Sequence, residues 1–121
     1  MRSPMTPDEL KRRTKRFALA IIGLVGSLPH NEAARVIGGQ ILRSGTSVGA
    51  NYRAACRARS RAEFSSRLGV AEEEADETLY WLELLEESGL TKGERIRGLM
   101  EEANELVAIF TASRKTATGK N

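Results

Sequence analysis

The chain has very few of the residues that build disulfides and zinc sites. Its 121 residues include one cysteine, Cys56, and one histidine, His30. A single cysteine excludes a disulfide framework within the chain, and the spacing typical of zinc ligands is absent. We therefore expect no metal and no cofactor, and a reducing cytoplasm as the compartment. Because prolines are also few and Ala, Leu, Glu and Arg are abundant, the composition favours helices.

Long hydrophobic runs are lacking as well. The apolar stretch 17–28 follows the basic segment "KRRTKR" and so imitates a secretion signal. The stretch is shorter than the roughly 20 apolar residues that span a membrane. Asp8 and Glu9 interrupt the basic region, and the apolar residues have the spacing of an ordinary amphipathic helix. We expect neither secretion nor an interaction with a membrane.

A strong charge of one sign is the third feature that is missing. The net charge is +3 and the sequence pI is about 9.4. This mild basicity permits an anionic partner without requiring one. The length predicts one domain, large enough for a core that needs no metal or disulfide.

Apolar residues recur at three- and four-residue steps in four segments, which is the pattern of amphipathic helices. Capping boxes begin three of these segments, at Thr6, Ser60 and Thr91. The pattern predicts an all-α, antiparallel up-down four-helix bundle with connections of about three residues. Its helices span about 7–28, 31–58, 61–88 and 92–113. We expect a flexible N-terminus over 1–5, the bundle over 6–113 and a disordered tail over 114–121.

The glycine-containing stretch "RSGTSVGAN", residues 43–51, resembles a phosphate-binding loop at first sight. At 100° per residue, however, the apolar stripe that includes Ile41, Val48 and Tyr52 keeps its phase through the glycines. No Gly-Lys-Ser/Thr sequence follows them. We therefore predict one continuous helix, in which a strip of small residues lets another helix approach closely. The strip consists of Ala34, Gly38, Gly45, Gly49 and Cys56.

Polar residues flank this apolar stripe. Ser44, Ser47 and Asn51 lie beside it on the helical wheel, and Arg43 lies further out. Partly buried polar groups must find partners. Our hypothesis is a polar seam against the third helix, in which Arg43 or Asn51 engages Asp76 or Glu77.

Positive charges gather on the first helix and on the side of the second helix opposite the core. Such a surface attracts phosphates through counterion release, without reading a sequence. An ordinary solvated face is the alternative interpretation. The candidate nucleic-acid-binding residues are Lys11, Arg12, Lys15, Arg16, Arg35, Arg53, Arg57, Arg59 and Arg61.

The segment "TLYWLELL", residues 78–85, is apolar almost all round the helix. Such a helix is buried on more than one side, and aromatic residues are enriched in subunit interfaces. Scattered surface hydrophobic residues are the alternative. We predict an oligomer interface that includes Tyr80, Trp81 and Leu84.

Acidic pairs at three-residue spacing suggest one enzymatic alternative. Glu73, Glu74 and Glu77, with Glu102 and Glu105, have spacings similar to those of magnesium-dependent all-α nucleotide pyrophosphohydrolases. Acidic pairs three residues apart also arise by chance on any charged helix. His30 and Cys56 give no support for nucleophilic catalysis, so we expect no catalytic residues and no enzyme.

The segments "IGGQILRSGTSVGANYRAACRARSRAEF" and "EEEADETLYWLELL" resemble a family of bacterial four-helix-bundle proteins. Its members were first seen as reading frames in intervening sequences of large-subunit ribosomal RNA genes. The resemblance covers about residues 10–112, and Arg43-Ser44-x-x-Ser47-x-x-x-Asn51 is its most specific part. Many members have glutamate where this chain has Ala54. The resemblance implies a left-handed up-down bundle that forms homopentamers.

A related branch comprises the accessory variability proteins of diversity-generating retroelements. The resemblance to this branch implies RNA or DNA, and a reverse transcriptase, as candidate partners. Together, these features predict a non-enzymatic, self-associating helical bundle that serves as a nucleic-acid-associated accessory or scaffold protein. A magnesium-dependent pyrophosphohydrolase and a purely structural oligomer are the alternatives.

Overall fold

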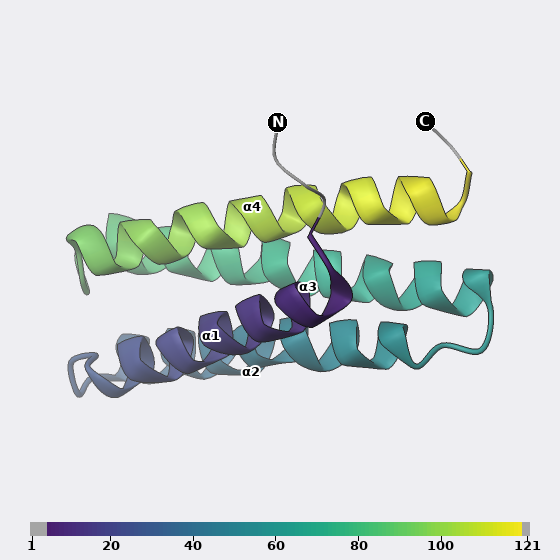
Figure 1. Ribbon diagram of the computed structural model, residues 1–121. Helices are drawn as coiled ribbons and strands as arrows, with labels where there is room; N and C mark the ends of the chain where they lie inside the picture. The colour runs from purple at the N-terminus through teal and green to yellow at the C-terminus, as the bar shows by residue number, and fades with distance from the viewer. Residues whose placement is uncertain (1–4, 120–121) are drawn as a thin grey trace.

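The computed structural model describes residues 5–119, which form four helices (Figure 1). The helices are α1 (Pro7–Gly26), α2 (Glu32–Cys56), α3 (Arg61–Glu87) and α4 (Glu94–Ala117). Successive helices run antiparallel, and no strand occurs within the described span. The predicted all-α four-helix bundle is therefore confirmed. Residues 1–4 and 120–121, which the predictions assigned to the N-terminus and to the tail, lie outside the described residues.

Helices α1 and α3 begin at the predicted residues, and the other six helix ends differ from the predictions by one to four residues. The connections span residues 27–31, 57–60 and 88–93, so they are longer than expected. The capping box at Thr6 is present, because its hydroxyl accepts from the backbone N–H of Glu9 at 3.1 Å. The capping box predicted at Thr91 is wrong. Gly93 caps α4 instead, with a φ of 118° that glycine tolerates, and no side chain contributes to this cap.

The C-terminal end of α4 corrects a second prediction. Residues 114–117 were expected in a disordered tail, but α4 continues to Ala117. Arg114 donates from Nη2 to Glu72 Oε1 on α3 at 2.7 Å, which ties the last turn to the bundle. Cations in the last turn also stabilise the negative end of the helix dipole. Neither the ion pair nor the dipole effect leaves a trace in the apolar periodicity. The periodicity therefore placed the end of the fourth helix too early.

Each helix contributes apolar side chains to one continuous core. Its largest fully buried side chains include Ile21, Ile41, Leu82 and Phe110, one from each helix. α2 packs against α1 and α3, and α4 packs mainly against α3. The α1–α4 pair makes the fewest contacts of the four neighbouring pairs, so that side of the bundle is the most open.

The glycines of α2 lie within a continuous helix, as predicted, and Gly38, Gly45 and Gly49 face α1 and the residues that follow it. A Cβ atom on Gly45 would lie 2.9 Å from two carbon atoms of the Ile21 side chain. A Cβ atom on Gly49 would lie 3.2 Å from Thr14 Oγ1. The small residues therefore allow close packing of α1 on α2. None of the helices described here is long and apolar enough to cross a membrane.

Candidate nucleic-acid interface

A groove runs between α1 and α2 on the outside of the bundle, with a volume of about 470 Å³. We call it the basic groove, because its lining includes five lysine or arginine residues and no acidic residue. Small residues and two threonines form the rest of its lining. The complete lining is Lys11, Arg12, Thr14, Lys15, Ala18, Thr46, Gly49, Ala50, Arg53 and Arg57.

The two helices place the charges in two facing rows. Lys11 and Lys15 are four residues apart on α1 and therefore lie on the same helix face. Arg53 lies in the last turn of α2, and Arg57 is the C-cap residue of the same helix. Cations at these positions also complement the helix dipole. Close packing at Gly49 keeps the floor of the groove narrow and free of large side chains.

The five cations are not used by other contacts. Within residues 5–119, no ion pair or hydrogen bond is made by the side chains of Lys11, Arg12, Lys15, Arg53 or Arg57. By contrast, four other arginines each contact a glutamate: Arg13, Arg35, Arg43 and Arg114. The positive charge of the basic groove is therefore available to an anion from solution.

The other four predicted basic residues lie elsewhere. Arg35 pairs with Glu32 on its own helix. Arg16 lines a different groove of about 550 Å³ between α1 and α4, which three glutamates also line. Arg59 and Arg61 border a hollow beside Cys56 at the α2–α3 connection. The structure thus brings five of the nine candidates together and separates the rest.

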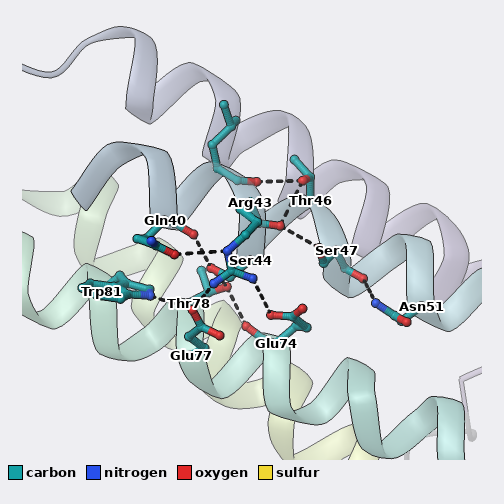
Figure 2. Close-up of polar contacts among 11 residues, drawn as sticks. Gln40, Arg43, Ser44, Thr46, Ser47, Asn51, Glu74, Glu77, Thr78 and Trp81 are labelled. Carbon is teal, nitrogen blue, oxygen red and sulfur yellow. Dashed lines mark hydrogen bonds and ion pairs between the residues drawn. The ribbon is translucent and has the colours of Figure 1, made fainter. Parts of the chain in front are cut away.

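A polar network joins α2 to α3 around Arg43 (Figure 2). Its guanidinium donates from Nη1 to Glu74 Oε1 at 3.3 Å and from Nη2 to Glu77 Oε2. Glu77 Oε2 also accepts from the indole Nε1 of Trp81 at 2.9 Å. Asp76, the other predicted partner, is exposed on α3 and lies outside this network. Glu74 was not predicted, although it lies one turn before Glu77.

The remaining residues of the predicted seam behave in two ways. Ser47 donates to Arg43 O and Asn51 donates to Ser47 O, so both bond within their own helix. Ser44 lies in the core and accepts a hydrogen bond from Thr78 of α3 at 2.8 Å (Figure 2). The sequence reasoning missed Thr78, although a polar residue within the apolar stripe of α3 was a usable signal.

Comparison with known proteins places the chain in a family. A model of the 23S rRNA-intervening sequence protein family matches residues 9–112. The chain belongs to this family. A crystal structure from Bacteroides thetaiotaomicron VPI-5482, of a protein with unknown function from the S23 ribosomal protein family, is similar. The TM-score is 0.84 at 37% sequence identity, over 92% of this chain and 99% of the other. A search of curated proteins found no match.

The acidic pairs of the chain are used in contacts with arginines. Glu102 and Glu105 accept from Arg13 at 2.6 Å and 2.7 Å, and Glu74 and Glu77 accept from Arg43. The hydrogen bonds that Arg13 donates to Glu102 are the main cause that raises the pKa of the Arg13 guanidinium above its ordinary value. Within the described residues, no three acidic, histidine or cysteine side chains come together as a metal site.

The predicted interface residues lie on α3, and the single histidine and cysteine lie at or near the ends of α2. Tyr80 is 53% exposed and packs edge-on against Trp81, with ring centroids 5.3 Å apart. Leu84 is half-buried one turn further along α3. His30 is exposed in the α1–α2 connection, and Cys56 is half-buried near Tyr52. Burial of Tyr52 raises the pKa of its hydroxyl, and Cys56 adds to this effect.

Proposed function

We propose that this protein is a nucleic-acid-associated accessory or scaffold protein that binds phosphate groups in the basic groove. The observation that carries the proposal is a set of five cations that form no ion pair with any residue of the described span, in a groove that no acidic residue lines. Placing cations beside phosphates releases condensed counterions, which favours binding without any contact to a base.

Self-association is the second part of the proposal. The exposed ring of Tyr80, beside Trp81, is an aromatic surface of the kind that is enriched in protein interfaces. One basic groove supplies few phosphate contacts, so its affinity at physiological salt would be low. Several copies in one assembly would present several grooves to one nucleic acid and raise the avidity strongly. Homopentamers are expected from the family resemblance, and the partner of an exposed aromatic patch is then another copy of the chain.

The first experiment measures the binding of labelled RNA and DNA by fluorescence anisotropy at 50 and 200 mM salt. The wild-type protein should bind at low salt and lose roughly a hundredfold or more of its affinity at the higher concentration. The double variant Arg53→Ala/Arg57→Ala should bind much more weakly at both. Arg35→Ala is the matched control, because it removes an exposed, paired arginine of the same helix. A wild-type protein that binds no nucleic acid at 50 mM salt would contradict the proposal.

The second experiment measures the mass in solution by light scattering. The wild-type protein should be an oligomer, and Tyr80→Ser should shift it toward the monomer. Leu19→Ser removes another exposed apolar side chain, on α1, and should leave the assembly intact. A monomeric wild-type protein would remove self-association from the proposal and leave the groove to be judged by the binding assay.

A further inference from the structure

The basic groove contains no aromatic side chain. All six aromatic residues of the chain lie elsewhere. Phe17, Tyr52 and Phe110 are buried in the core, and Tyr80 and Trp81 lie on α3, which does not neighbour α1. Proteins that bind single-stranded nucleic acid combine cations with aromatic rings on which unpaired bases stack. The basic groove has the cations and lacks the aromatic rings.

The hydroxyl groups of the groove are also unavailable as donors. Thr14 donates to Leu10 O at 2.9 Å, and Thr46 donates to Leu42 O at 2.7 Å. The backbone N–H groups beneath them belong to continuous helices. A ligand in the groove therefore meets donors only on the lysine and arginine side chains. Four of these five side chains are exposed and reach outward: Arg12, Lys15, Arg53 and Arg57.

We infer that the basic groove selects base-paired nucleic acid over single strands and holds it by its phosphates, independently of base sequence. This inference rests on the proposed function. A duplex carries one charge per roughly 1.7 Å of its axis, about twice the charge density of a single strand. A site that offers cations but no stacking surface gains from the denser charge and gains nothing from unpaired bases. Double-helical DNA and double-helical RNA share this phosphate chemistry.

The test compares labelled 20-nucleotide single strands with their duplexes, as DNA and as RNA, each in an AT- or AU-rich and a GC-rich version. At about 100 mM salt, each duplex should bind at least tenfold more tightly than either of its strands. The two base compositions should differ by less than threefold. With five phosphate contacts per groove, each groove that engages the duplex should contribute about −4.5 to the slope of log K against log salt for duplex DNA.

The variant Arg53→Lys/Arg57→Lys separates charge from planar recognition. Lysine keeps the positive charge but cannot form the bidentate or stacked contacts of a guanidinium. Because the groove uses only charge, this variant should keep its duplex affinity within about threefold, while Arg53→Ala/Arg57→Ala loses it.

Single strands that bind as tightly as duplexes would overturn the inference and leave the proposed function standing. A large loss in the lysine variant, or a strong dependence on base composition, would also overturn the inference alone. A wild-type protein that binds neither form would remove both the proposed function and the inference.

Discussion

The hydroxyl of Thr78 donates to Ser44 Oγ at 2.8 Å, and both side chains are fully buried between α2 and α3. Each hydroxyl also lies close to a carbonyl of its own helix, Gln40 O for Ser44 and Glu74 O for Thr78. No buried side-chain polar atom in the described part of the chain lacks a partner. Since an unmatched buried hydroxyl is costly, this pair favours one register of α2 on α3.

A double-mutant cycle tests the coupling of this pair. Ser44→Ala and Thr78→Val should each lower the free energy of unfolding by about 1 kcal/mol, because each removes one buried hydrogen bond. The double variant should lose less than the sum, since the shared bond is lost only once. Urea unfolding measures the free energy of unfolding of the wild-type protein, the two single variants and the double variant. Losses that add to within about 0.3 kcal/mol would show that the two hydroxyls do not interact.

The four helices were predictable from the sequence because their core positions repeat with the helical period. The glycines of α2 did not interrupt that period, so the continuous helix was predictable as well. The two ends of α4 were not predictable from the sequence. Gly93 begins α4 through a backbone conformation, and Arg114 extends it through a pair with Glu72, and neither leaves a periodic signal.

The candidate site was predictable only in part. Arg12 and Arg13 are neighbours in one basic run, yet only Arg13 faces Glu102, which follows 89 residues later. The sequence shows which residues are charged, but the fold decides which charges are neutralised. For the same reason the sequence offered Asp76 and Glu77 as partners of Arg43 without choosing between them, and it did not indicate Glu74.

Two glycines of α2 should respond oppositely to alanine. At Gly45 the new Cβ would lie 2.9 Å from the branched, fully buried side chain of Ile21, so this side chain or the helix would have to shift. Gly45→Ala should therefore destabilise the protein by about 1–3 kcal/mol. At Gly39 nothing lies within 4 Å of the new Cβ, so Gly39→Ala should stabilise it by up to about 1 kcal/mol through helix propensity. The melting temperatures of the two variants measure these changes. Equal shifts in melting temperature would contradict the close packing of α1 on α2.

The ion pair between Arg13 and Glu102 should stabilise the side of the bundle where α1 and α4 make few contacts. The side chain of Arg13 is 14% exposed and that of Glu102 is 27% exposed. Arg13→Ala should lower the free energy of unfolding by about 1–3 kcal/mol, because it leaves a half-buried carboxylate without its partner. Glu105→Gln should cost less than about 1 kcal/mol, since Glu105 is 60% exposed. Urea unfolding at low salt measures both losses.

Arg12, the residue before Arg13, provides the matched control for this ion pair. Arg12→Ala should reduce duplex binding several-fold and leave the stability nearly unchanged, because Arg12 is exposed and makes no ion pair in the described structure. Arg13→Ala should do the reverse, since glutamates already neutralise its charge. If both variants weakened binding equally, the assignment of Arg12, and not Arg13, to the basic groove would be wrong.

Tyr52 should make the protein less stable at alkaline pH. Burial raises the pKa of its hydroxyl above the ordinary value of 10.0. Above pH 10 the unfolded chain therefore releases a proton that the folded chain still holds, and the free energy of unfolding falls as the pH rises. By pH 11 this loss should reach roughly 1.4 kcal/mol, the equivalent of one pKa unit. Tyr52→Phe keeps the ring that packs 5.9 Å from Phe110 and removes the ionisable group.

Urea unfolding of the wild-type protein and Tyr52→Phe at pH 8, 9, 10 and 11 measures this effect. The stability of the variant relative to the wild-type protein should stay constant up to pH 9 and rise by roughly 1.4 kcal/mol at pH 11. Tyr80→Phe is the control, because it changes an exposed tyrosine on α3 and leaves Tyr52 in place. The other ionisable residues are the same in the wild-type protein and in Tyr52→Phe, so the difference between the two proteins isolates Tyr52. Parallel curves for the wild-type protein and Tyr52→Phe would show that Tyr52 ionises as readily in the folded chain as in the unfolded one.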